Sequence, residues 1–130
     1  MEIGIKNVIE IKVTKENTAA ALGSGTLSVF ATPAMIALIE QTAWKSVEPY
    51  LDEGQGTVGT KLDISHLSPT PVGMTVKCET ELTGIDGRCL RFEANVYDET
   101  GLIGKGVHER FIISSDKFQI KADSKLTSRD

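Results

Sequence analysis

Three residues have side chains and positions suited to acid–base chemistry: Thr32, Glu40 and His66. Glu40 follows six consecutive apolar residues, and a carboxylate in such surroundings is costly unless it is paired or used. His66 ends an alternating strand just before the loop S-P-T-P, and an imidazole carries protons near neutral pH. Thr32 stands at the expected start of a helix, beside unpaired N–H groups that can stabilise an oxyanion. Each residue also has a structural explanation: a solvent-facing glutamate, a core histidine and a helix cap.

Three further residues are candidates for contacts with a ligand: Gly59, His108 and Arg110. A glycine at position 59 allows a close approach of the backbone to a ligand, or it simply continues a turn. His108 and Arg110, two residues apart, form a small cationic face that holds a phosphate or faces solvent. The two cysteines and two histidines of the chain lack the spacing of a metal site, so we expect no metal.

The pattern of the chain predicts one strand, one long helix and then four antiparallel strands. Thr32 as N-cap and Pro33 as first helical residue begin the helix, and Pro49 ends it. The six apolar residues predict a helix that is buried on nearly all sides. The expected elements, listed in chain order, are a strand at 1–15, a loop at 16–31, the helix at 32–50, four strands within 56–114 and a frayed polar tail at 119–130. This order fits an α+β protein of the hot-dog type, in which an antiparallel sheet wraps around a central helix.

The alternation within the strands predicts which face each residue takes. In the second strand Val58, Leu62, Ile64 and His66 share the inner face and Gly59 the outer one. We expect a bulge near residue 7 in the first strand. A three-residue turn at 85–87 is expected between the third and fourth strands, and the odd-numbered residues of 102–114 are expected to face the core.

Composition narrows the class of protein. A chain of 130 residues fits one domain with one core, and a net charge of −4 argues against a general nucleic-acid binder. Neither a signal peptide nor a membrane-spanning run is apparent, which favours the cytoplasm and no membrane partner. Cys78 and Cys89 are expected on opposite faces of the sheet as free thiols.

The spacing of Thr32 and Glu40 indicates how a site would have to be assembled. Eight residues of regular helix separate them, which is about 12 Å. Short side chains at that distance do not reach the same atom unless the helix start bends or two subunits combine. Free sheet edges also tend to pair with a second copy, so we expect a homodimer with a site at the interface.

Several motifs together resemble one family. These are FATPAMIALIEQTAWKSVEPYLDEGQGTVGT, the strand ending in His66 with SPTPVGMTV, and GKGVHERF near the C-terminus. Over about residues 30–120 the chain is similar to hot-dog thioesterases of the fluoroacetyl-CoA thioesterase type. The resemblance implies a homodimeric acyl-CoA thioester hydrolase that uses no metal or other cofactor.

The same resemblance implies roles for individual residues. Thr32, Glu40 and His66 match the catalytic threonine, glutamate and histidine, and Gly59 matches the glycine that positions the thioester carbonyl. Glu40 would act as nucleophile or as base for water, His66 as proton carrier, and Thr32 as an orienting donor. In fluoroacetyl-specific enzymes phenylalanines ahead of the helix form a lid, whereas AAALGSGTLSV has no aromatic residue. We therefore expect a small or medium acyl-CoA substrate, not necessarily fluoroacetyl-CoA.

Two other functions known for hot-dog proteins are alternatives to a thioesterase. A non-catalytic module that binds acyl-CoA would show saturable binding without turnover. A dehydratase is disfavoured, because Asp63 and His66 are too close in sequence and point to opposite faces of their strand.

Overall fold

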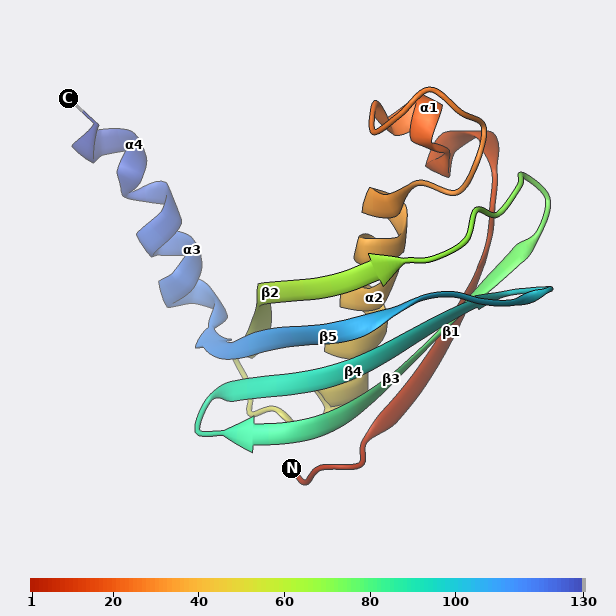
Figure 1. Ribbon diagram of the computed structural model, residues 1–130. Coiled ribbons are helices and arrows are strands. Elements are labelled where there is room, and N and C mark those ends of the chain that lie inside the picture. Colours follow the sequence, from red (N-terminus) through yellow and green to blue (C-terminus); the bar gives the residue numbers. More distant parts are fainter. Residues whose placement is uncertain (130) are drawn as a thin grey trace.

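The computed structural model of the protein describes residues 1–129. Within them, five antiparallel strands form one sheet in the order β1-β3-β4-β5-β2, and the long helix α2 lies against one face (Figure 1). The strands are β1 Lys6–Lys12, β2 Gln55–His66, β3 Thr75–Asp86, β4 Cys89–Asp98 and β5 Gly101–Ser114. The helices are α1 Ala19–Leu22, α2 Thr32–Val47, α3 Ser115–Asp123 and α4 Lys125–Ser128, and the 3₁₀ turns are η1 Lys15–Asn17 and η2 Glu48–Tyr50. The predicted α+β arrangement is confirmed.

Both the N-cap and the first helical residue of α2 lie one position earlier in the chain than the sequence predicts. Ala31 is the N-cap with extended backbone angles, so Thr32 is the first helical residue and Pro33 the second. The prediction that Thr32 caps the helix is therefore wrong, and its hydroxyl is available for another partner. At the other end the α-helix stops at Val47, and Pro49 lies in the following 3₁₀ turn.

Helix α2 is buried on one side only, because the sheet covers only one side of it. Its buried residues are Met35, Leu38, Ile39, Thr42, Ala43, Ser46 and Val47. Ala37, in the middle of the apolar run, is exposed, so the prediction of burial on nearly all sides is wrong. Glu40, whose side chain is 38% exposed, lies at the border of the buried side of α2 and reaches Arg110 of β5.

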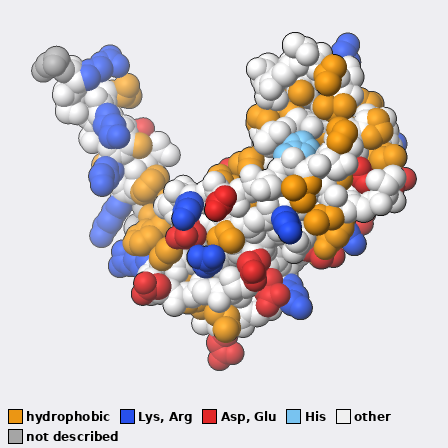
Figure 2. Space-filling view, in the orientation of Figure 1, with side chains coloured by type: hydrophobic (Ala, Val, Ile, Leu, Met, Phe, Trp, Pro, Cys, Tyr) orange, Lys and Arg blue, Asp and Glu red, His pale blue; other side chains and the backbone are white. Residues whose placement is uncertain are grey.

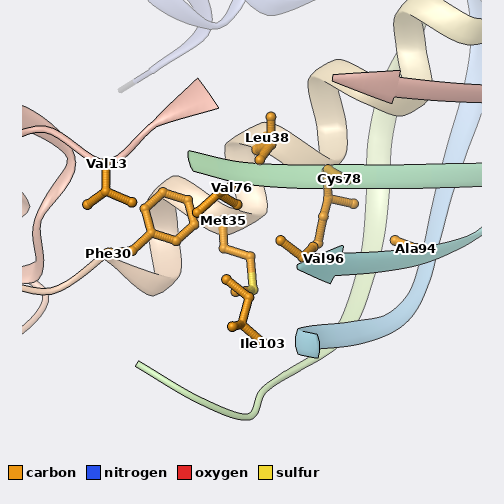
Figure 3. Close-up of a cluster of buried hydrophobic side chains, with 10 residues drawn as sticks. Val13, Phe30, Met35, Leu38, Val76, Cys78, Ala94, Val96 and Ile103 are labelled. Atoms are coloured by element: carbon orange, nitrogen blue, oxygen red, sulfur yellow. The ribbon is translucent and has the colours of Figure 1, made fainter. Parts of the chain in front are cut away.

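The main core lies between α2 and the sheet. Met35 and Leu38 of α2 pack with Phe30, Val76 and Val96, all of them almost fully buried (Figure 3). A smaller cluster lower along α2 is made of Ala43, Val47, Leu82, Leu90 and Phe92. These two clusters hold α2 firmly against the sheet and so fix the position of the groups near Thr32 and Glu40.

Bulges in β2 and β5 change the faces that the alternation predicts. Thr60 is an extra residue in β2, so Gly59 lies opposite Arg110 and Leu62 lies opposite His108. Gly59 therefore shares the inner face with Leu62 and His66, and its predicted outer position is wrong. The even residues of β5 are the inward ones: His108 and Arg110 are 0% and 5% exposed, which overturns the predicted odd face.

Ile103 explains why the odd face looked like the core. A register shift between Val96 and Tyr97 of β4 leaves Ile103 unpaired in β5, and this residue turns inward. Phe111, which has the same odd parity but lies beyond the shift, is 39% exposed. One bulge thus reverses the face of every following residue in the strand.

Other local predictions are corrected in the same way. β1 pairs with β3 without a shift from Lys6 to Lys12, so no bulge is present near Asn7, which faces inward and bonds to the Thr42 carbonyl at 3.1 Å. The β3–β4 turn has two residues, since Asp86 pairs with Cys89, and Thr83 is the bulged residue that restores the inner register. In the described part of the tail, where the sequence predicts a frayed end, α3 and α4 extend as far as Ser128.

Candidate active site

Thr32 and His66 form the first functional pair. The Thr32 hydroxyl oxygen lies 2.7 Å from Nδ1 of His66, which joins the start of α2 to the end of β2. Both residues line a pocket of about 230 Å³ together with Phe30, Leu67 and Pro69. Among the described residues His66 Nε2 has no hydrogen-bond partner, although the atom is shielded from solvent.

The electrostatics of this pair favour a neutral imidazole. Burial lowers the pKa of His66 below its ordinary value of 6.5, and the backbone at Ser68 offsets part of that effect. When Nδ1 of the neutral ring donates to the Thr32 hydroxyl oxygen, Nε2 is left unprotonated and the Thr32 hydroxyl keeps its own proton for another acceptor. Nε2 is then the atom that exchanges a proton with a substrate or with water.

Glu40 and Arg110 form the second functional group. Nη1 of Arg110 lies 3.4 Å from Oε2 of Glu40, and the guanidinium is almost fully buried while the carboxylate is partly open. Thr57 holds the other side of the guanidinium: Nε donates to its hydroxyl at 2.8 Å and Nη2 to its carbonyl at 2.9 Å. The guanidinium of Arg110 is therefore held by β2, and its Nη1 faces the Glu40 carboxylate.

His108 completes this group and is held in one tautomer. Its Nδ1 donates to the Lys61 carbonyl at 2.8 Å, and its Nε2 accepts from Arg110 Nη1 at 3.2 Å. Burial, followed by the nearby Arg110 charge, lowers the pKa of His108, although the Lys61 carbonyl and the Glu40 charge act in the opposite direction. His108 is therefore neutral at neutral pH and serves to position Arg110.

Gly59 is the backbone position closest to Glu40. A Cβ at this glycine would lie 2.5 Å from Glu40 Oε2, 3.3 Å from His108 Cε1 and 3.4 Å from Arg110 Nη1. The carboxylate thus rests where any larger residue would place a side chain. The space at position 59 therefore fits glycine alone, and its expected approach to a ligand stays a prediction.

The structure brings four of the six predicted site residues together. Glu40, Gly59, His108 and Arg110 form one group, which we call the carboxylate group, and Thr32 with His66 form the hydroxyl–imidazole pair. Helix α2 is continuous from Thr32 to Val47, so the two groups stay about 12 Å apart along it. Within one chain they do not meet.

His108 and Arg110 do not form the cationic surface that the sequence suggested. Both are buried and their donors are engaged by Thr57, Lys61 and Glu40, so neither the solvated face nor an exposed phosphate site fits them. Their predicted role in substrate binding stays a prediction. Sequence reasoning missed Thr57, for which only its place two residues before Gly59 gave any signal.

The rest of the described chain offers no competing catalytic centre of this kind. A larger open depression of about 730 Å³ lies over the sheet, where Glu79, Glu81 and Glu93 face Lys6 and Lys105, and it contains none of the site residues. In residues 1–129 no cluster of three or more His, Cys, Asp or Glu side chains is arranged to hold a metal ion. Across the same residues, no helix combines the length and the apolarity that crossing a membrane requires.

Comparison with known proteins places this geometry in a family. Residues 13–116 match the model of the family described as fluoroacetyl-CoA-specific thioesterase. The chain belongs to that family. Over 97 residues the chain is also 38% identical to the fluoroacetyl-CoA thioesterase of Streptantibioticus cattleyicolor, which covers 75% of this chain and 70% of that protein. The predicted family and thioester hydrolase activity are thereby confirmed, and a purely binding module is not favoured.

Solved structures of the family and its relatives share the whole fold. The fluoroacetyl-CoA thioesterase FlK superposes with a TM-score of 0.92 at 32% identity and covers 96% of this chain and 97% of its own. A thioesterase superfamily member of Thermus thermophilus superposes with a TM-score of 0.89 at 26% identity, with 98% and 97% coverage. A hot-dog-like protein of Thermanaerovibrio acidaminovorans, 20% identical, has the same fold with a TM-score of 0.87. The hot-dog fold expected for this thioesterase family is thus confirmed.

Proposed function

We propose that the protein hydrolyses small or medium acyl-CoA thioesters at a site shared by two protomers. The observation that carries the proposal is the arrangement along β2. Gly59, beside Glu40, and His66, bonded to Thr32, lie on the same inner face of this strand, whose residues 59–63 are exposed along its free edge. Strand β2 therefore carries one half of a site at Gly59, beside Glu40, and the other half at His66, beside Thr32.

Antiparallel pairing of two β2 edges would combine the two halves. Gly59 and His66 are about 20 Å apart along one strand, but neighbouring strands are separated by only about 4.8 Å. A register that sets Gly59 opposite the partner's His66 brings Glu40 to the partner's Thr32–His66 pair. The two-fold symmetry of such a dimer generates two equal sites.

The chemistry of hydrolysis then divides among the three residues. The Glu40 carboxylate attacks the thioester carbonyl or removes a proton from the attacking water, the C–S bond breaks, and the CoA thiolate receives a proton through His66. Thr32 and the first amides of α2 stabilise the oxyanion. Water supplies the hydroxyl of the acid product, so the reaction as proposed needs no cofactor apart from the CoA of its substrate.

The assay is release of the CoA thiol from acyl-CoAs of graded length, with fluoroacetyl-CoA included. Glu40→Gln and His66→Ala should each lower kcat by at least about 100-fold without loss of fold. Glu48→Gln, an exposed acid just beyond the same helix, is the matched control and should keep full activity. Wild-type kcat in Glu40→Gln would overturn the proposed chemistry.

Subunit mixing tests the shared site directly. When Glu40→Gln and His66→Ala chains are exchanged in equal amounts, mixed dimers hold one site with both native groups. The mixture should recover about a quarter of the wild-type activity. If each site belonged to a single chain, no recovery would occur.

The route of attack has its own experiment. Attack by Glu40 forms a mixed anhydride, and in a single turnover in ¹⁸O-labelled water its opening at the Glu40 carbonyl leaves ¹⁸O in the carboxylate. Direct attack by water never labels Glu40. Label found by mass spectrometry in the peptide that contains Glu40 therefore identifies the acyl-enzyme.

A further inference from the structure

The C-terminal arm, residues 115–129, has no buried residue and packs little against the rest of the described chain. It consists of α3 and α4, every residue of it is exposed, and it extends away from the sheet from the end of β5 (Figure 1). Phe118, Ile120 and Leu126 are 44%, 67% and 63% exposed. An isolated helix of this length is only marginally stable in water, so the arm requires a surface to pack against.

The match to a solved relative extends into this arm. The superposition on FlK covers 96% of this chain, and the remaining 4% is shorter than the arm, so the match extends into it. Lys117, Lys121 and Lys125 recur every four residues along the arm, and the exposed apolar residues Phe118, Ile120 and Leu126 each adjoin one of these lysines in sequence.

The topology determines which part of a second copy this arm would meet. The arm follows Ser114, which pairs with Gln55 at the first residue of β2, whereas His66 is the last residue of β2. In Figure 1 the arm and the segment around α1 both extend past β2, at opposite ends of that strand. A two-fold axis through paired β2 edges exchanges the two ends, so the arm of one protomer comes beside the α1 segment and His66 of its partner.

The surface at that position is apolar. Leu67, which lines the Thr32–His66 pocket, is 52% exposed, and Leu22 and Leu27, which belong to the α1 segment, are 49% and 65% exposed. Figure 2 shows hydrophobic atoms gathered around the histidine on this face, and an open gap separates this surface from the arm. Exposed apolar groups on the arm and around the pocket thus face the same space.

We propose that the arm of one protomer packs across the α1 segment of its partner and forms the outer wall of the partner's acyl pocket. The surface that covers the apolar side chains of the arm therefore belongs to a second copy of this chain. In this arrangement Phe118, the aromatic side chain of the arm, lies over that pocket. This inference rests on the dimer and the pocket of the proposed function and adds a specificity-determining element from the other subunit.

Cross-linking tests the placement without any turnover. The full chain with Cys89→Ser, which removes the half-buried thiol, receives Leu27→Cys in one preparation and Phe118→Cys in another. After exchange of subunits and mild oxidation, a disulfide-linked pair of the two different chains is expected on a non-reducing gel. Arg88→Cys in place of Leu27→Cys, an exposed position at the far β3–β4 turn, is the matched control and should give no link.

A single chain that carries both Leu27→Cys and Phe118→Cys distinguishes the alternatives. Linked dimers support the proposal, whereas a link within one chain, at monomer mass, would overturn it. A dimer by light scattering that forms no link would overturn it as well, while leaving the thioesterase proposal intact. A monomer by light scattering would overturn both the arm placement and the shared site.

Kinetics provide the second readout. Phe118→Ala should raise KM for a medium-chain acyl-CoA by about ten-fold with the dimer mass unchanged, and Phe118→Leu should restore most of the affinity. The KM for acetyl-CoA should change less, because a short acyl group does not reach the outer wall. Equal effects on both substrates would contradict a wall of the acyl pocket.

Discussion

Replacement of Gly59 by alanine is the sharpest test of how the carboxylate is held. The added Cβ would lie 2.5 Å from Glu40 Oε2, whereas ordinary contact begins at 3.4 Å. The carboxylate must therefore retreat by about 0.9 Å, the difference between these two distances. A misplacement of about 1 Å can cost about 100-fold in rate, which is about 2.7 kcal/mol of transition-state stabilisation.

The fold should tolerate this substitution. Gly59 does not have a positive φ and lies on the exposed edge strand β2, so alanine brings no backbone strain. We expect kcat for acyl-CoA hydrolysis to fall about 100-fold while the free energy of unfolding stays within about 0.5 kcal/mol of wild type. Thiol release under saturating substrate and urea denaturation measure the two quantities.

Gly84→Ala is the matched control for this test. Gly84 is also in a strand without a positive φ, and its added Cβ would make an ordinary contact of 3.4 Å with Arg91 Cβ. This variant should keep wild-type kcat. If Gly59→Ala also kept wild-type kcat in a folded protein, the position of Glu40 beside Gly59 would have no part in catalysis.

Other perturbations follow from the same contacts. Arg110→Met should lower kcat at least ten-fold and the free energy of unfolding by about 2 kcal/mol, less than for a fully buried pair because the Glu40 side chain stays 38% exposed. Arg110→Lys should not restore activity, because one ammonium cannot bond to Thr57 and Glu40 together; steady-state kinetics check both variants. Because burial lowers the pKa of His66 below 6.5, kcat/KM should stay level through neutral pH and fall only below pH 6.5, and a limb centred above 6.5 would contradict this. The lowered pKa of His108 contributes stability that is present above pH 6.5 and is lost as the pH falls through the folded-state value, so His108→Gln should flatten the decrease in unfolding free energy between pH 7 and pH 5. Gly104→Ala, whose Cβ would lie 2.5 Å from the buried Met35 Sδ, should cost about 1–3 kcal/mol in thermal or urea unfolding.

The residue types along the chain were sufficient to indicate the fold, and the resemblance of several motifs to one family indicated the family. An apolar run that opens at Thr32-Pro33 and is followed by alternating strands describes a helix against an antiparallel sheet, because both periods depend only on local geometry. The positions of Thr32, Glu40 and His66 as candidates for proton transfer came from the same local patterns. Their catalytic roles are still predictions, which the kinetic experiments above address.

The faces of the strands were decided by tertiary pairing. The bulges at Thr60 and Ile103 arise where one strand has a residue more than its partner, and no single-strand alternation contains that information. They turn Gly59, His108 and Arg110 inward and so create the carboxylate group around Glu40. The sequence by itself determined which side chains are present, and only the paired strands decided which of them meet, because contact between strands depends on register across the sheet and not on order along the chain.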